Sequence, residues 1–227
     1  MTARRAQIYI VSGPSGSGKT TMVEHLLKTV PGLLFSVSFT TRPPRPGEQN
    51  GREYRFVSRE RFEAMLARDE FLEYARVFGD YYGTARSAVA AAEKQGQDLL
   101  LDIDVQGARQ VKSRQADAIA ILLLPPSWQE LERRLRGRGV DSPEIVQKRL
   151  QRAREEIESY ETYDFVVVNR DLQESCALLE VIVTAERLRH SGQPVPAAVG
   201  ARAGAARRDA NKSRISAILE TFGTQTP

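Results

Sequence analysis

Four apolar runs recur along the chain, and segments with helical periodicity separate them. The runs cover residues 8–13 (IYIVSG), 99–104 (LLLDID), 119–124 (IAILLL) and 164–169 (DFVVVN). Near-continuous apolar runs of this length are typical of strands that are buried on both faces of a parallel sheet. Their alternation with helical segments predicts an α/β fold, in which helices cover both faces of that sheet.

Helix starts are marked by polar residues at three points between these runs. Ser127 with Glu130, and Asp171 with Glu174, have the spacing of a capping box, in which the first side chain bonds the backbone three residues later. Ser142 precedes Pro143, which places a capping residue before a proline at the first helical position. Helices are therefore expected to begin at these three points.

Three stretches depart from the alternation. Residues 37–85 are rich in aromatic residues, Arg, Pro and Gly, which predicts a small mixed β insertion around one helix at 59–68. Residues 133–155 carry many arginines. From residue 192 the Ala, Gly, Pro and Arg content predicts a flexible basic tail, with a short amphipathic segment near Ile215 and Phe222. The predicted core then consists of residues 1–36, 86–132 and 156–191, and the tail of residues 192–227.

Composition narrows the class of protein. The chain has 227 residues, of which 41% are hydrophobic, and no apolar run reaches the roughly 20 residues of a membrane span. Its start does not have the pattern of a signal peptide.

The only cysteine, Cys176, cannot form an internal disulfide, which fits a reducing cytoplasm. The two histidines have no metal-ligand spacing. Three of the four net positive charges lie after residue 191, so the body of the chain does not require a nucleic-acid partner.

The first apolar run leads directly into a glycine-rich turn. Residues 13–20 (GPSGSGKT) match the pattern G-x-x-x-x-G-K-[ST], in which backbone N–H groups and the following helix N-terminus surround phosphate oxygens. Lys19 would reach the β- and γ-phosphates, and the Thr20 hydroxyl would bind Mg²⁺. A chance match in a loop is the alternative. The apolar strand before the turn and the apolar helical stripe after it favour the phosphate-binding loop (P-loop).

Further motifs follow the P-loop in a characteristic order. They are SVSFTTRPPRPGEQNGREYRFV (36–57), EFLEYARVFGDYYGT (70–84), LLLDIDVQGA (99–108) and RRLRGRG (133–139). Over about residues 6–190 the chain resembles the guanylate kinases, which transfer phosphate from ATP to GMP. The resemblance implies a P-loop α/β core, a GMP-binding insertion at 37–85 and a helical lid at 133–155. It also implies a cytoplasmic enzyme that uses ATP, GMP and Mg²⁺, without a membrane or nucleic acid as partner. The oligomeric state is left open, and the tail lies outside the resemblance.

The ATP side is expected to combine the P-loop with the lid. The expected ATP-binding residues are Gly13, Pro14, Ser15, Gly16, Ser17, Gly18, Lys19, Thr20, Thr21 and, near adenine, Asn169. Arg170 follows Asn169 where acidic residues are common in the family, which weakens that assignment. Lys19, Arg134, Arg138 and Arg149 are expected to be catalytic, with Arg152 as a further lid residue, because the transferring group carries negative charge. An exposed basic helix is the alternative for the lid arginines.

The GMP side is expected to hold a phosphate and to read a base. Arg42, Arg45, Tyr54 and Tyr82 match the phosphate grip of the family, and arginine suits phosphate because its planar fork bonds two oxygens. Guanine presents N1–H and an amino group as adjacent donors, so a carboxylate is its natural complement. Glu73 is the expected reader, and the resemblance adds Ser38, Thr84, Asp102 and Asp104 to the base side. The resemblance implies that one of these aspartates faces Mg²⁺ and the other faces guanine, without assigning the two roles, and Asp102 is the candidate to reach Mg²⁺ through water. The alternative for both aspartates is a cap on the following helix.

Two other functions share part of this pattern. A P-loop kinase of a sugar phosphate, such as ribose bisphosphate, needs no guanine reader, so the combination of Glu73, Ser38 and Thr84 disfavours it. A catalytically silent binding module with the same fold typically lacks an intact P-loop and lid, so Lys19, Thr20 and the arginines disfavour it. Cys176, His25 and Trp128 are interpreted as packing or surface residues.

Overall fold

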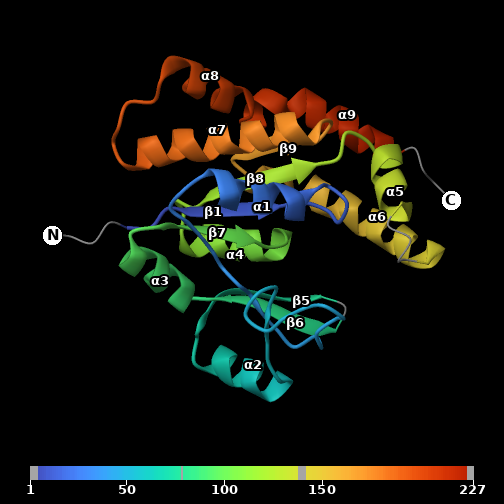
Figure 1. The fold of residues 1–227 in the computed structure, drawn as a ribbon. Coiled ribbons are helices and arrows are strands. Elements are labelled where there is room, and N and C mark those ends of the chain that lie inside the picture. Colours follow the sequence, from blue (N-terminus) through green and yellow to red (C-terminus); the bar gives the residue numbers. More distant parts are fainter. Residues whose placement is uncertain (1–4, 78, 138–141, 224–227) are drawn as a thin grey trace. The chain divides into compact units, whose positions relative to one another are not determined.

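The computed structural model describes residues 5–77, 79–137 and 142–223 (Figure 1). The chain forms two compact units, which are described separately: unit 1 contains residues 1–10 and 32–118, and unit 2 contains residues 11–31 and 119–227. Unit 1 contains the predicted insertion at 37–85 together with part of the predicted core, and unit 2 contains the P-loop and the C-terminal residues. Within unit 1, the helix after residue 104 lies against the strand at 71–77. The domain boundaries expected from the sequence stay a prediction.

A five-stranded sheet has the order β2-β7-β1-β8-β9. The pairing is parallel between β2 and β7, with Leu34 opposite Leu99, and between β8 and β9, with Leu123 opposite Val167. All four predicted strands occur in it, which confirms the α/β class. The strands are β1 (Ile8–Ser12), β2 (Leu33–Phe35), β7 (Asp98–Asp102), β8 (Ile119–Leu124) and β9 (Phe165–Val168).

Unit 1 also contains a four-stranded mixed sheet in the order β4-β3-β6-β5. Phe62 of helix α2 stacks on Phe71 of β5, with ring centroids 4.3 Å apart, and both side chains are buried. The helix therefore packs on the small sheet, and the region contains short strands and one helix, as its sequence predicted. The elements are β3 (Phe39–Thr40), β4 (Arg55–Phe56), β5 (Phe71–Val77), β6 (Asp80–Ala85), α2 (Arg59–Ala67), α3 (Ser87–Gln95) and α4 (Val105–Arg114).

Unit 2 confirms the predicted helix starts. Ser127, Ser142 and Asp171 each accept a hydrogen bond from the backbone N–H three residues later, and Pro143 occupies the first helical position of α6. The helical elements of this unit are α1 (Lys19–Thr29), α5 (Trp128–Arg136), α6 (Pro143–Glu158), the short η1 (Tyr160–Thr162), α7 (Leu172–His190), α8 (Ala197–Ala205), η2 (Arg208–Asn211) and α9 (Lys212–Gly223).

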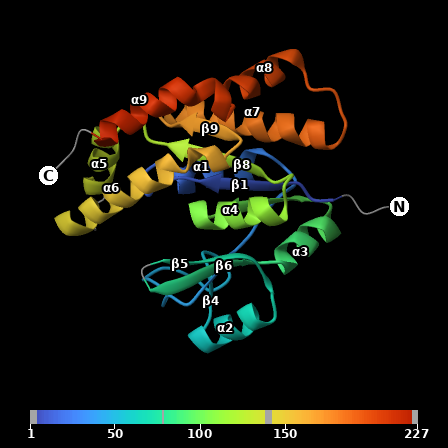
Figure 2. The same cartoon turned by 180° about the vertical axis from the view of Figure 1, so that it is seen from behind.

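The C-terminal residues differ from the sequence prediction of a flexible tail. Residues 197–223 form α8, η2 and α9, and Ile215, Ile218 and Phe222 of α9 are buried. Figures 1 and 2 show that α8 lies beside α7 and that the end of α9 lies next to α5. The composition misleads because alanine is a strong helix former and allows close packing, so an Ala-rich segment need not be a linker. Within the described part of the chain, none of the helices is both long and apolar enough to span a membrane.

Candidate functional site

The P-loop of unit 2 connects β1 to α1. Gly18 caps α1 with a left-handed backbone (φ 93°), and a Cβ at this position would lie 2.4 Å from Nδ2 of Asn169. Gly16 also has a positive φ, and a Cβ there would lie 2.8 Å from Cδ1 of Leu131. Both positions therefore favour glycine for two reasons: the backbone conformation is strained for other residues, and a side chain would displace Asn169 or Leu131. Lys19, Thr20 and Thr21 then form the first turn of α1, where the helix N-terminus favours anions.

Two side chains from distant segments of unit 2 contact the P-loop. Nδ2 of Asn169 donates to the carbonyl oxygen of Ser17 at 2.7 Å, and Asn169 is buried. Nη1 of Arg149, on α6, donates to Oγ of Ser15 at 2.8 Å. Arg149 thus contacts the P-loop, and its expected catalytic role stays a prediction. Asn169 thus stabilises the backbone of the loop. Its expected contact with adenine is a different role and stays a prediction.

Two of the arginines of α5 share one carboxylate. Glu130 bonds both Arg133 and Arg134 at 2.7 Å, and these bonds, with Arg133 as the largest contribution, lower the pKa of Glu130 to about 2. Arg134 also donates from Nη2 to the carbonyl oxygen of Asn169 at 3.0 Å. It is therefore oriented toward the residue that supports the P-loop. Arg152 pairs with Glu156 on its own helix at 3.1 Å, and Arg138 lies outside the described residues.

The P-loop side offers the Thr20 hydroxyl as a candidate ligand for Mg²⁺. Thr20 is exposed in the first turn of α1, so its hydroxyl is accessible to a metal ion. Among the described residues there is no group of three or more His, Cys, Asp or Glu side chains that would hold a metal alone. Mg²⁺ commonly binds through one or two protein groups together with substrate phosphates, and this arrangement is compatible with such a site.

Unit 1 contains a buried carboxylate on β5. Glu73 is 3% exposed, and Thr84 of β6 lies opposite it in the strand pairing. Burial raises the pKa of Glu73 to about 7, and the nearby Asp104 carboxylate adds to this shift. A hydrogen bond from the Thr84 backbone partly opposes this shift, because it stabilises the carboxylate. Oγ1 of Thr84 is buried and meets no partner at hydrogen-bonding geometry within the described residues. A carboxylate and a hydroxyl that are buried side by side are suited to a ligand with polar edges.

The two aspartates after β7 have different environments. Oδ1 of Asp104 accepts hydrogen bonds from the backbone of Gln106 and Gly107, each at 3.0 Å, so Asp104 caps α4. A Cβ at Gly107 would lie 2.5 Å from Oε2 of Glu73, so only glycine lets α4 approach the carboxylate this closely. The capping alternative therefore describes Asp104 in this structure. Asp102 ends β7 and is half-buried, and its expected contact with Mg²⁺ through water stays a prediction.

Three of the four expected phosphate-grip residues gather in unit 1. The Arg42 guanidinium lies 5.5 Å from the centre of the Tyr54 ring, and the Tyr54 and Tyr82 rings are 5.7 Å apart. Glu48 binds Arg42 at 2.8 Å, and this hydrogen bond raises the pKa of Arg42. The other oxygen of Glu48 accepts the backbone N–H of Arg45 at 2.6 Å. Glu48 thus organises the loop that carries both arginines.

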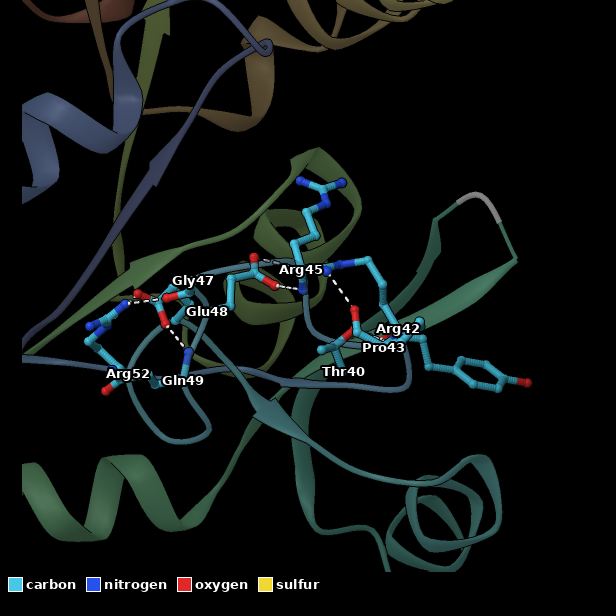
Figure 3. Close-up of polar contacts among 10 residues, drawn as sticks. Thr40, Arg42, Pro43, Arg45, Gly47, Glu48, Gln49 and Arg52 are labelled. Atoms are coloured by element: carbon cyan, nitrogen blue, oxygen red, sulfur yellow. Dashed lines mark hydrogen bonds and ion pairs between the residues drawn. The ribbon is translucent and has the colours of Figure 1, made fainter. Parts of the chain in front are cut away.

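Arg45 and Ser38 are not among the side chains that contact one another around Arg42, Tyr54 and Tyr82 in the described interactions. Figure 3 shows the Arg45 side chain extending away from the Glu48 carboxylate, and Arg45 is exposed. Ser38 precedes β3 and is half-buried, and its carbonyl oxygen accepts the backbone N–H of Arg55 at 2.8 Å. Their expected contacts with GMP stay predictions.

Sequence reasoning missed two of the residues that shape these sites. Glu48 could have been found, because a lone acidic residue in the Pro- and Arg-rich strip 42–52 invites pairing with an arginine. Gly107 gave no local signal, because its importance comes from Glu73, which lies 34 positions earlier and on another element.

The fold and the P-loop place the chain among the P-loop nucleotide-binding α/β proteins, and the arginines at the P-loop are typical of phosphoryl-transfer sites. Comparison with known proteins is more specific: the guanylate kinase family model matches residues 5–186. The chain belongs to the guanylate kinase family.

Individual relatives agree with this assignment. A guanylate kinase of Koribacter versatilis is 48% identical over 226 residues, which cover 96% of this chain and 97% of the relative. A guanylate kinase of Neisseria gonorrhoeae is 53% identical over 190 residues, with 84% and 93% covered. The crystal structure of guanylate kinase from Anaplasma phagocytophilum aligns with a TM-score of 0.65 at 33% identity, covering 82% of this chain and 88% of that one. The Koribacter match includes most of the C-terminal helices, which lie beyond the family model.

Proposed function

We propose that the chain transfers the γ-phosphate of ATP to GMP and releases ADP and GDP. The membership of the guanylate kinase family supports this activity, as does the division of the candidate residues into a P-loop group in unit 2 and a carboxylate and arginine group in unit 1. Because both substrates are small nucleotides, we further propose that the protein acts in the cytoplasm.

The observation that carries the choice of GMP is the buried Glu73 beside Thr84. In its ionised form Glu73 would accept hydrogen bonds from both N1–H and the amino group of guanine. Adenine has an acceptor at N1. The ionised Glu73 would then face another acceptor, and no hydrogen bond could form between them. Sites that bond a specific polar edge reject a mismatched ligand strongly because buried groups remain unpaired.

The P-loop residues and the arginines would act mainly by positioning and by stabilising negative charge. Lys19 would neutralise charge on the transferring phosphate, and Arg149 would do so from the lid side, since its guanidinium is within hydrogen-bonding distance of Ser15. When bound with ATP, Mg²⁺ would supply further charge neutralisation at the phosphate oxygens, and Thr20 is the residue we propose to hold it. Arg42, with Tyr54 and Tyr82, would hold the phosphate of GMP.

A coupled ADP-release assay tests this function. The purified chain is supplied with ATP and Mg²⁺ and with GMP, AMP, ribose bisphosphate or no acceptor in parallel. We expect ADP release that depends on GMP and exceeds release with AMP by orders of magnitude. Release that depends on the sugar phosphate would contradict the proposal, as would release that is equal for all acceptors.

A further inference from the structure

The C-terminal helices are joined to the edge of the main sheet. Residues 192–223, which we name the C-terminal extension, include a backbone bridge between Arg207 and Phe165 of β9. The backbone N–H of Val166 donates to the carbonyl oxygen of Ala206 at 2.9 Å, and that of Arg208 to Asp164 at 3.0 Å. The extension is therefore a built part of unit 2, and its position is fixed by β9.

Arg207 adds a side-chain anchor at the same place. Its guanidinium lies 4.8 Å from the centre of the Phe165 ring and binds Glu186 of α7 at 3.1 Å. The carboxylate of Glu186 is 8% exposed, so this pair is shielded from solvent on one side. Backbone and side-chain bonds together hold the start of α9.

The other end of α9 contacts the first residue of α5. The backbone N–H of Trp128 donates to Oγ1 of Thr221 at 3.0 Å, and Oγ1 of Thr221 donates to the carbonyl oxygen of Ile218 at 2.6 Å. The Trp128 and Phe222 rings pack edge to face, with centroids 5.1 Å apart, and Phe222 is 1% exposed. The first N–H groups of a helix lack partners within it. Thr221 therefore supplies part of the cap of α5 from the extension.

Helix α5 in turn packs directly on the P-loop. Leu131 and Leu135 are buried, and their side chains would be the first atoms met by a Cβ at Gly16, at 2.8 and 3.4 Å. On the same helix, Arg134 bonds the carbonyl oxygen of Asn169, whose amide bonds Ser17 of the loop. A shift of α5 would thus be transmitted to the P-loop through apolar packing and through Asn169.

We propose that Thr221 and Phe222 are positioning residues for phosphoryl transfer, which hold α5 against the P-loop. This inference rests on the proposed function. Phosphoryl transfer depends mainly on the alignment of the phosphates, and a displacement of about 1 Å away from the chemistry can reduce the rate about 10²-fold. The extension lies beyond the region that the family model matches, although the Koribacter relative covers most of it, so the support of α5 comes from residues outside the family model.

The single tryptophan of the chain makes the contact directly measurable. Trp128 is the only Trp, so its fluorescence reports on the α5–α9 contact when tryptophan is excited selectively over the seven tyrosines. The variants are Phe222→Ala and the milder Thr221→Val, with Phe222→Leu as the conservative replacement. Ser216→Ala, at an exposed position of α9, is the matched control. All are assayed at a temperature well below their measured Tm.

We expect Phe222→Ala to shift Trp128 emission to longer wavelength and to lower kcat about tenfold, with KM for GMP within about twofold. Thr221→Val should show the same changes to a smaller extent, Phe222→Leu should recover most of the kcat, and Ser216→Ala should leave both readouts unchanged. A shift in Trp128 emission with unchanged kcat in both Phe222→Ala and Thr221→Val would overturn the inference, because the extension would then only stabilise the fold. An equal loss of kcat in Ser216→Ala would also overturn it.

Failure of the proposed function is distinguishable from failure of this inference. If the unaltered chain shows no GMP-dependent ADP release, the proposed function is wrong. The binding of a non-hydrolysable ATP analogue then tests the support of the P-loop by itself. Weaker binding in Phe222→Ala, but not in Ser216→Ala, would support that role, and equal binding in all variants would contradict it.

Discussion

Glu73 links the proposed base reading to pH. Its pKa is raised to about 7 because the carboxyl group is buried, so near neutral pH the free protein holds it partly protonated. Only the carboxylate accepts both hydrogen bonds from guanine. We therefore expect kcat/KM for GMP to fall about tenfold for each pH unit below 7, since kcat/KM reports the ionisation of the free enzyme.

The control for this pH profile is Glu73→Gln. The phosphate of GMP also titrates, with a second pKa near ~6, and it does so identically with both proteins. The ratio of kcat/KM of the unaltered chain to that of the variant therefore reports only the ionisation of Glu73. That ratio should rise with pH through about 7. A ratio that is flat from pH 5.5 to 8.5 would show that Glu73 does not read the base.

The same residue should cost stability at high pH. The folded carboxyl group keeps its proton up to about pH 7, whereas the unfolded group loses it near the ordinary value of 4.5. The free energy of unfolding is thus highest below pH 4.5 and falls as pH rises from 4.5 through 7, by about 3.4 kcal/mol at 1.36 kcal/mol per pKa unit. Thermal melts should show that Glu73→Gln raises Tm relative to the unaltered chain at pH 8 but not at pH 4. An equal Tm difference at both values would contradict the buried ionisation.

At the residue scale, local motifs were predictable and long-range partners were not. The P-loop glycines follow a short sequence pattern, and the resemblance to the guanylate kinases identified Glu73 and Thr84 as candidates. The support of Ser17 by Asn169 was missed, because the two residues are 152 positions apart and only the fold brings them together. The Asp104 cap was an open alternative, because a strand-end aspartate suits both a ligand and the next helix.

At the element scale, α6 brings one arginine to the P-loop and leaves another in solvent. Arg149 donates to Ser15, whereas Arg154, on the same helix, pairs with Glu158 and is half exposed. Arginines that stabilise the charge of a transferring phosphate contribute about 10³–10⁵ in rate. Arg149→Ala should therefore lower kcat by about 10³ with little change in the Kd of GMP, measured by stopped-flow turnover and calorimetry.

Arg154→Ala is the matched control for that experiment. It removes the same kind of side chain from the same helix, and surface ion pairs contribute little to stability, about 0–1 kcal/mol. We expect kcat within about twofold of the unaltered chain, since exposed substitutions are usually mild. If Arg149→Ala changed only the affinity for ATP, Arg149 would be a binding group without a role in the transition state. The sequence makes the same prediction for Arg138, which lies outside the described residues.

The elements themselves were largely predictable because their signals are local. The strands at 99–104 and 119–124 were apparent from continuous apolar runs, and Ser127, Ser142 and Asp171 marked helix starts that the structure confirms. Helix α8 was not apparent, because Pro194, Pro196 and three glycines between 192 and 204 are typical of linkers. Its packing on α7 is a tertiary effect, which overrides local propensity.

At the scale of the whole molecule, the C-terminal extension changes what truncation is expected to do. The sequence favours a dispensable tail after residue 191. In the structure, Ile215, Ile218 and Phe222 are buried, and the extension pairs with the outer edge of β9. Each buried side chain of this size contributes about 1.5–3 kcal/mol, and an uncovered strand edge favours aggregation. Removing residues 192–227 should therefore lower stability by several kcal/mol and expose β9.

The measurement is a thermal melt combined with size-exclusion chromatography of chains that end at Ser191 or at Gly223. The shorter chain should melt at least about 5 °C lower, since 1 kcal/mol corresponds to about 2–4 °C for a chain of 150–250 residues. It should also elute partly as larger species, because the edge of β9 and the ring of Phe165 lose their cover. The chain that ends at Gly223 retains all described elements and should match the full chain in both assays. If the chain ending at Ser191 melted at the same temperature as the full chain and remained a single species, the extension would be dispensable, as its composition first suggested.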